Sequence, residues 1–365
     1  MNALTTEALE AHLAQFTLPQ TERPLGRAGS QIDVQSGDDG MVVDIQLGFP
    51  VDHSKARLVE QLQAHCAALD PALRPTFRIG WAVQAHAVQK GLKPLPGVSN
   101  LIAVASGKGG VGKSTVAVNL ALALALEGAR TGLLDADIYG PSQPKMLGLV
   151  GQRPHTADGK TLEPLIGHGL KTMSIGFLVD EKQPMAWRGP MVTSALNQLL
   201  MQTQWGELDY LLIDMPPGTG DIQLTLSQRV PVSGAVIVTT PQDVALADAR
   251  KGLEMFEKVS VPVLGIVENM SVHVCSSCGH EEAVFGSGGG ERLSGDYGLP
   301  LLGALPLVKS IADDTEQGRP TVIADPEGPI AARYLALAGR AAGELAALRK
   351  DYSSLFPTIT IEEDS

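Results

Sequence analysis

Cysteine and positive charge are both scarce in this sequence of 365 residues. Only three cysteines are present, and the acidic, helix-patterned N-terminus does not resemble a secretory signal, so we expect a reducing, cytoplasmic setting. Lysine and arginine together number 28 against 40 aspartates and glutamates, which gives a net charge of −12. This balance argues against a general nucleic-acid surface and a polybasic membrane patch, so we expect neither nucleic acid nor membrane as a partner.

Long hydrophobic runs are also missing. The best candidate, residues 116–126, is interrupted by Asn119 and ends at Glu127, so it does not predict a transmembrane span. Hydrophobic residues still make up 44% of the chain, and 40 glycines and 24 prolines accompany them, as is typical of an α/β protein with many tight turns. Because the chain is long for one core, we expect one large domain and a smaller one.

A glycine-rich motif, Gly107-x-x-x-x-Gly112-Lys113-Ser114, is the strongest functional signal. An apolar run before it predicts a buried strand, and the Ala/Leu-rich run after it predicts a helix, which is the context that cradles a triphosphate. Lys113 would reach the β- and γ-phosphates of ATP, and the Ser114 hydroxyl would hold Mg²⁺. The alternative is a chance glycine-rich turn, which the agreement of motif and context disfavours. The expected nucleotide-binding residues of the loop are Gly107, Lys108, Gly109, Gly110, Val111, Gly112, Lys113, Ser114 and Thr115.

Carboxylates follow two of the predicted strands. Asp135 and Asp137 come after the second strand of the large domain, where Asp137 would act on the attacking water and Asp135 would support the site. Taken alone, this pair fits a cap or turn equally well. Asp214 ends a later apolar strand and would hold Mg²⁺ with Ser114, while Gly218 in the next turn would sense the γ-phosphate as a switch.

Lys108 has no role in an ordinary phosphate loop. We interpret it as a lysine that acts across a dimer, where it adds positive charge as negative charge accumulates in the transition state. The simpler alternative is a solvated lysine. The expected catalytic residues are therefore Lys108, Lys113 and Asp137.

The predicted elements indicate two domains. Residues 1–88 have the pattern of a small α/β domain, residues 89–99 form a linker rich in proline and glycine, residues 100–350 form the ATPase domain, and residues 351–365 form an acidic tail. In the large domain, strands and helices alternate, which predicts a doubly wound, mostly parallel sheet of the phosphate-loop NTPase type. Its expected strands are residues 101–106, 131–135, 170–175, 210–214, 235–239, 263–268 and 301–305, and its expected helices are 114–127, 191–202, 243–259 and 331–350.

The pair Cys275-x-x-Cys278 is a candidate metal site, because such a turn brings two thiolates to one centre. Two ligands do not close a site, so either a second chain supplies two more cysteines or His273 and His280 complete a zinc site. A redox pair is a third possibility, but the motif does not follow a strand at a helix start. The residues alone favour zinc and iron–sulfur equally. Cys66 shares the apolar face of a predicted helix and is expected to be a buried structural thiol.

The glycine-rich loop resembles the deviant phosphate loop of the MinD/ParA/nitrogenase-iron-protein class. Four further motifs closely resemble the signatures of the Mrp/ApbC family of iron–sulfur cluster carriers, over about residues 95–340. They are Leu133-Leu-Asp-Ala-Asp-Ile-Tyr-Gly-Pro-Ser-Gln-Pro-Lys-Met-Leu-Gly148, Asp214-Met-Pro-Pro-Gly-Thr-Gly-Asp221, Val267-Glu-Asn-Met-Ser271 and Cys275-Ser-Ser-Cys-Gly279. The family's usual proline after the first cysteine is Ser276 here, which affects the stiffness of the loop more than its ligation.

The resemblance implies a cytoplasmic homodimeric ATPase that binds a [4Fe–4S] cluster through Cys275 and Cys278 and passes it to apo-proteins, with assembly scaffolds as further partners. It implies that Lys108 is the signature lysine, Asp137 the hydrolytic aspartate and Asp214 the metal-site aspartate. Asn269 resembles the residue that reads the adenine edge, for which an amide that both donates and accepts is suited. ATP, Mg²⁺ and the cluster are the implied cofactors.

Three other functions compete with this hypothesis. A MinD/ParA-like positioning ATPase would need a membrane-binding tail or a basic DNA-binding face, whereas this C-terminus is acidic. A zinc-stapled dimeric ATPase would hold zinc at the cysteines. An electron-transferring reductase would need lone cysteines in two separate loops, which the sequence lacks.

Overall fold

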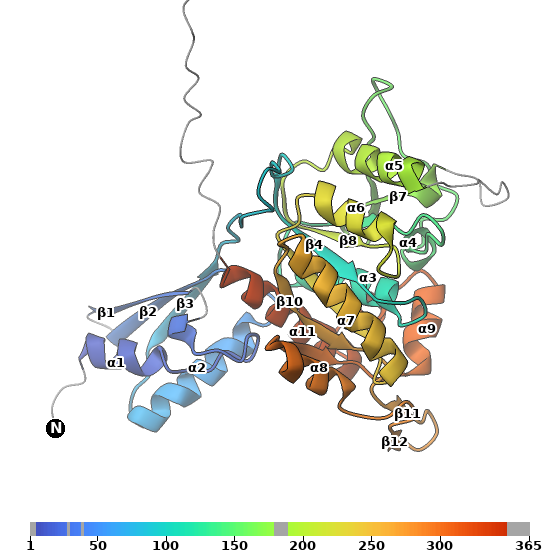
Figure 1. Ribbon diagram of the computed structural model, residues 1–365. Helices are drawn as coiled ribbons and strands as arrows, with labels where there is room; N and C mark the ends of the chain where they lie inside the picture. The colour runs from blue at the N-terminus through green and yellow to red at the C-terminus, as the bar shows by residue number, and fades with distance from the viewer. Residues whose placement is uncertain (1–4, 28–29, 38–39, 179–188, 349–365) are drawn as a thin grey trace, which may run out of the picture.

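The computed structural model describes residues 5–27, 30–37, 40–178 and 189–348. Within these ranges an eight-stranded sheet forms the centre, in the order β13-β10-β9-β4-β8-β5-β7-β6 (Figure 1). Every neighbouring pair is parallel except β6 and β7. The strands are β4 (Val98–Ala105), β5 (Thr131–Asp135), β6 (Leu165–Gly167), β7 (Leu170–Ser174), β8 (Leu208–Asp214), β9 (Gly234–Thr239), β10 (Val263–Glu268) and β13 (Leu301–Ala304).

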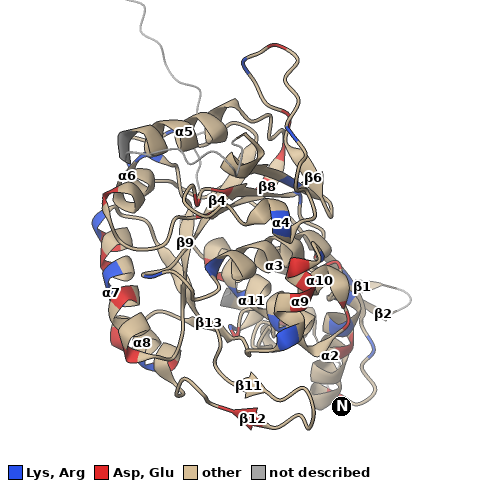
Figure 2. Cartoon of the chain, turned by 90° about the vertical axis from the view of Figure 1, so that its right-hand side faces the viewer, with Lys and Arg blue, Asp and Glu red and all other residues tan. Residues whose placement is uncertain are grey.

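Helices cover both faces of this sheet, as Figure 2 shows nearly edge-on. One layer holds α5 (Gly189–Gln202), α6 (Asp221–Arg229), α7 (Asp243–Lys258) and α8 (Gly289–Tyr297). The other holds α3 (Lys113–Leu126), α4 (Gln143–Met146), α9 (Lys309–Glu316), α10 (Thr321–Ala324) and α11 (Pro329–Ala346). Because both faces are covered, the inner strands are buried along nearly their whole length, which explains their continuous apolar runs. The predicted doubly wound α/β fold is confirmed.

A second, three-stranded sheet is built by the N-terminal residues. Its order is β1 (Gln31–Gly37), β2 (Gly40–Leu47), β3 (Thr76–Trp81), with β1 antiparallel and β3 parallel to β2. The helices α1 (Thr6–Leu13) and α2 (Lys55–Leu69) lie along one side of it (Figure 1). The predicted linker of residues 89–99 overlaps the start of β4 at Val98, and the division into domains stays a prediction.

The N-terminal residues pack against the nucleotide-binding part through the end of α3. Glu127, the C-cap of α3, is 5% exposed, and its carboxylate accepts hydrogen bonds from the backbone N–H and the hydroxyl of Ser54, both at 3.1 Å. Ser54 is the N-cap of α2. Burial raises the pKa of Glu127, partly offset by the bonds from Ser54. Helix α3 thus begins at the phosphate loop, and its C-terminal end contacts the start of α2 in the N-terminal part of the chain.

Several elements differ from the predicted ones. The sequence patterns did not indicate the three-residue strand β6, the helices α6 and α8–α10, or the two-residue strands β11 (His273–Val274) and β12 (Glu281–Glu282). The predicted acidic tail at 351–365 lies outside the described residues. No helix within the described ranges is both long and apolar enough to cross a membrane.

Candidate nucleotide site and cysteine hairpin

The glycine-rich loop connects the end of β4 to the start of α3, as predicted. Gly110 and Gly112 both have φ of +80°, a left-handed conformation that favours glycine. Gly107 is required for a different reason, because a Cβ there would lie 2.2 Å from the backbone carbonyl of Asp248 in α7. Since α3 starts at Lys113, its first backbone N–H groups face the loop and provide an anion-binding site.

Lys113 and Asp214 form a buried ion pair at the base of this loop. The Lys113 ammonium donates to Oδ1 of Asp214, lies 3.2 Å from the Ser114 hydroxyl and lies 3.9 Å from Oδ2 of Asp137. Asp214 is fully buried, and Asp137 is 9% exposed. The structure therefore brings together four residues predicted from three separate motifs: Lys113 and Ser114 of the loop, Asp137 and Asp214. The Ser114 hydroxyl and the buried Asp214 carboxylate are oxygen ligands of the kind that Mg²⁺ prefers, so these two residues would hold the ion.

Asp137 and Asp135 have different surroundings. Asp135 is fully buried, and its Oδ2 accepts from the Ser174 hydroxyl at 3.0 Å and from the backbone N–H groups of Ser142 and Gln143 at 3.1 Å each. This bonding makes it a structural support, as expected. Burial raises the pKa of Asp137, while the nearby Lys113 ammonium acts in the opposite direction. A carboxylate with a raised pKa beside the phosphate loop suits a group that handles a proton.

Gln143 is a site residue that the sequence analysis missed. Its side-chain Nε2 donates to Oδ2 of Asp214 at 2.8 Å and to the Ser114 carbonyl at 3.0 Å, and the residue is fully buried. Its Oε1 is buried without a hydrogen-bond partner among the described residues. Gln143 thus fixes the carboxylate of Asp214 on the side opposite Lys113. The only sequence signal for Gln143 was its position after Asp137 within the signature motif of residues 133–148.

Gly218 and Lys108 are two further predicted residues at the loop. The Gly218 N–H donates to the Ser106 carbonyl at 3.0 Å, and its φ is +102°. Any contact of this N–H with a γ-phosphate therefore requires the bond to Ser106 to open. The Lys108 side chain is half-buried, and in the part of the chain that the structure describes no ion pair involves its ammonium.

Asn269 lies directly beside the phosphate loop. Its Nδ2 donates to the Val111 carbonyl at 2.9 Å, and its backbone N–H donates to the Thr239 carbonyl at 2.8 Å. A Cβ on Gly112 would lie 2.2 Å from this Nδ2, so the glycine permits the close approach. The amide predicted to read adenine is thus at the nucleotide site, and its nitrogen here holds the loop.

The cysteine pair lies in a turn between β11 and β12, at the lower end of the molecule in Figure 1. The Cys275 N–H donates to the His280 carbonyl and the Gly279 N–H donates to the Cys275 carbonyl, both at 2.9 Å. Cys278 is exposed and Cys275 is half-buried. Backbone N–H groups of Ser277 and Cys278 lower the pKa of the Cys275 thiol, which favours the thiolate that binds metals.

Neither predicted histidine completes a metal site in this chain. Within the described ranges, no group of three or more His, Cys, Asp or Glu side chains is arranged to hold a metal ion. His273 pairs with Glu282 in the hairpin ladder, and His280 lies in the turn that follows the cysteines. One chain therefore offers two thiolates and an incomplete site. Cys66 is fully buried in α2, as predicted.

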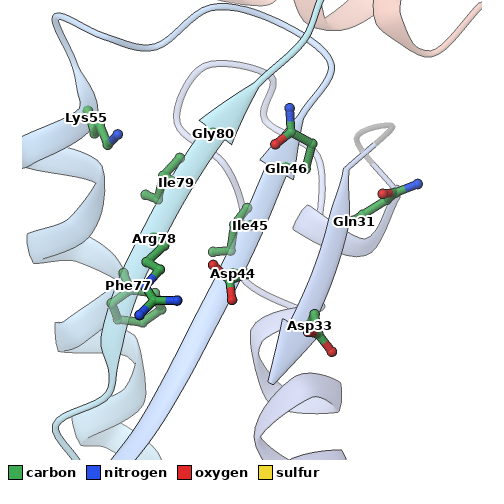
Figure 3. Close-up of a pocket in the computed structure, with 10 residues that line it drawn as sticks. All are labelled: Gln31, Asp33, Asp44, Ile45, Gln46, Lys55, Phe77, Arg78, Ile79 and Gly80. Carbon is green, nitrogen blue, oxygen red and sulfur yellow. The ribbon is translucent and has the colours of Figure 1, made fainter. Parts of the chain in front are cut away.

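A separate hollow of about 640 Å³ lies on the N-terminal sheet (Figure 3). Asp44 of β2 and Arg78 of β3 line it on neighbouring strands, together with Asp33 and Lys55. All of its lining residues lie between 31 and 80, so it shares no residue with the phosphate loop or the cysteine hairpin.

Comparison with known proteins gives a family match over most of the chain. The family model described as ParA, the NUBPL iron-transfer P-loop NTPase, matches residues 97–342. The chain belongs to this family. Among the proteins similar to this chain is an iron–sulfur cluster carrier protein of Escherichia coli strain K12, which is 52% identical over 351 residues and 94% of both chains. Another carrier protein, from Pseudomonas fragi, is 58% identical over 76% of this chain and 97% of its own. The mouse iron–sulfur cluster transfer protein NUBPL is 54% identical over 67% of this chain and 77% of its own.

Two solved structures are similar in fold to this chain. A nucleotide-binding protein from Archaeoglobus fulgidus in complex with ADP is 39% identical, with a TM-score of 0.57 over 64% of this chain and 91% of its own. The MinD protein of Pyrococcus horikoshii with Mg-ADP has 24% identity and a TM-score of 0.50 over 66% of this chain and 94% of its own, which shows the shared fold alone.

Proposed function

We propose that this protein is an ATP-hydrolysing carrier that binds a [4Fe–4S] cluster between two copies of the chain and transfers it to apo-proteins. The observation that carries the proposal is the presence, in one fold, of a phosphate-loop site and a hairpin that carries two cysteines, of which Cys278 is exposed and Cys275 half-buried. The names of the relatives support the same function. Apo iron–sulfur proteins and the scaffolds on which clusters are assembled are the proposed partners, in the cytoplasm.

Hydrolysis would use the residues around Lys113. The loop N–H groups and Lys113 would neutralise the β- and γ-phosphates, and Ser114 and Asp214 would hold Mg²⁺, which supplies further charge neutralisation when bound. Asp137, 3.9 Å from the Lys113 ammonium, would orient the attacking water and accept its proton. For Lys113 to reach the phosphates, its ion pair with Asp214 would have to open.

A dimer would complete the cluster site. A [4Fe–4S] cluster is commonly held by four thiolates, and a two-fold axis through the hairpins supplies Cys275 and Cys278 twice. Exposed apolar side chains near the nucleotide site support such a contact: Tyr139, two residues after Asp137, is 61% exposed, and Val244 at the start of α7 is 70% exposed. Lys108 would then reach the partner's nucleotide, and the lack of an ion pair on its ammonium within the described residues is consistent with this role.

The decisive experiment is transfer from anaerobically reconstituted protein to an apo-enzyme whose activity needs a [4Fe–4S] cluster, with and without ATP. We expect activation of the apo-enzyme by wild type, and none by the Cys275→Ala, Cys278→Ala variant. Protein that hydrolyses ATP but holds no iron, or that is isolated with stoichiometric zinc without oxygen, would instead indicate a positioning ATPase or a zinc-stapled dimer.

A further inference from the structure

Residues 269–275, here termed the arm, join the nucleotide site directly to the cysteine hairpin. The arm starts at Asn269, whose side chain bonds the phosphate loop, and ends at Cys275. At about 3.3 Å per extended residue it spans at most about 20 Å. It continues the end of β10, so a short, covalently continuous segment joins the residue that contacts the phosphate loop to a predicted cluster ligand.

Backbone hydrogen bonds hold the arm against the segment that follows β13. The Ser271 N–H donates to the Leu305 carbonyl at 2.9 Å, the Leu307 N–H donates to the Val272 carbonyl at 2.7 Å, and the Val274 N–H donates to the Leu307 carbonyl at 3.3 Å. The Ser271 hydroxyl adds a bond to the Leu305 carbonyl at 3.1 Å. From Ser271 onward the arm is therefore paired along its length with the segment that follows β13.

Met270 is the one arm residue with an unusual backbone. Its φ is +57°, in the left-handed region, where residues other than glycine are disfavoured. It lies between the loop contact of Asn269 and the ladder that starts at Ser271. Strained residues of this kind persist where the surrounding contacts fix them, and they are concentrated at functional and switching sites. Met270 thus sets the direction in which the arm leaves the nucleotide site.

Asn269 has two competing uses for its amide. In this structure its Nδ2 donates to the Val111 carbonyl, and a base edge that engages the same nitrogen would have to compete with that bond. Gly112, next to Val111, has no Cβ, and this lets the amide approach the loop. A bound nucleotide that engages this amide would therefore replace the contact between Asn269 and Val111.

We propose that Met270 is a positioning residue, and that the arm transmits the nucleotide state of the phosphate loop to Cys275 and Cys278. The inference rests on the proposed function and adds its regulation: nucleotide binding changes the Asn269–Val111 contact, the strained backbone at Met270 turns that change into a displacement of the ladder, and the exposure of the thiols changes. Two such sites are coupled by a free energy that typically corresponds to a 5- to 150-fold effect.

The test measures the alkylation rates of Cys275 and Cys278 by iodoacetamide in reduced, cluster-free full-length protein, with and without Mg-ADP. Peptide mass spectrometry separates the sites, and buried Cys66 serves as an internal reference. We expect saturating ADP to change the rates of Cys275 and Cys278 by at least about fivefold. In Met270→Gly, which removes the backbone strain, ADP should bind within about twofold of wild type while the rate change falls below about twofold.

Met270→Ala is the matched control, because alanine loses the same side chain but keeps the cost of the left-handed backbone. It should keep most of the response. Ser271→Ala, which lacks the hydroxyl bond to Leu305, should reduce the response and serves if Met270→Gly does not fold. If ADP binds but the thiol rates do not respond, or if Met270→Gly responds fully, the coupling is wrong while the proposed function stands. If ADP does not bind to wild type, the proposed function itself fails.

Discussion

Lys113 donates to Oδ1 of Asp214, 101 residues further along the chain, inside a site from which water is almost excluded. Each residue is the other's charge partner in this structure, and each is expected to serve the nucleotide, Lys113 on phosphate and Asp214 on Mg²⁺. In the absence of nucleotide the two side chains neutralise each other. When nucleotide binds, phosphate would replace Asp214 as the partner of Lys113, and Mg²⁺ would replace Lys113 as the partner of Asp214.

This relationship predicts the result of a double-mutant cycle. Lys113→Ala should abolish hydrolysis and lower the free energy of unfolding by about 3–5 kcal/mol, because it leaves the buried Asp214 carboxylate without a cation. Adding Asp214→Asn removes that charge, so the double variant should recover much of the stability but no ATPase activity. Urea unfolding and phosphate release measure the two quantities. Equal instability of the single and double variants would show that the ion pair does not dominate the effect.

Asp137 should separate binding from hydrolysis. Asp137→Ala is expected to bind ADP within a few-fold of wild type, because the residue is not part of the phosphate loop, while the ATPase rate falls by about 10²–10⁴-fold as for loss of a general base. Fluorescence titration with a labelled ADP and single-turnover hydrolysis distinguish the two effects. An ATPase rate close to that of wild type would exclude Asp137 as the hydrolytic residue.

Gln143 should affect Mg²⁺ more than nucleotide. Gln143→Leu leaves Oδ2 of Asp214 without its 2.8 Å donor, so we expect the gain in ADP affinity on adding Mg²⁺ to fall about tenfold. ADP affinity measured in EDTA should stay unchanged. Gln143→Asn, with the same amide on a shorter side chain, is the matched control and should recover part of the Mg²⁺ effect. A uniform loss of affinity with and without Mg²⁺ would indicate a merely structural role.

Glu127 gives a prediction about pH. Because burial raises its pKa in the folded protein, the folded state retains this proton to higher pH than the unfolded chain does. That contribution to stability is present below the ordinary glutamate pKa of about 4.3 and is lost as the pH rises through the raised value. The stability of wild type relative to Glu127→Gln should therefore decrease as the pH rises above about 4.3.

The chemistry of the phosphate loop was predictable because it depends on local requirements. Gly110 and Gly112 occupy left-handed backbone and Lys113 starts a helix, so spacing alone indicated the geometry. The meeting of Asp214 with Lys113 followed from a rule about topology, since parallel strands deliver their last residues to one edge of the sheet.

Other features depend on tertiary contacts that leave no pattern in the sequence. Gln143 begins the four-residue helix α4, which is too short for a periodic pattern, and its neutral amide gives no charge signal of its bonds to Asp214 and Ser114. Methionine is not expected in a left-handed conformation, so nothing indicated the backbone of Met270. Strand β6 has only three residues, too few for an alternating pattern.

The central claim, a cluster shared by two chains, is tested most directly by its stoichiometry. Protein reconstituted anaerobically with iron and sulfide should be analysed for iron, sulfide and zinc, with native mass spectrometry to define the assembly. The account predicts one [4Fe–4S] cluster per two chains, lost in the Cys275→Ala, Cys278→Ala variant, which should still bind ADP. A cluster that persists in this double variant, or one that is bound by a single chain, would contradict it.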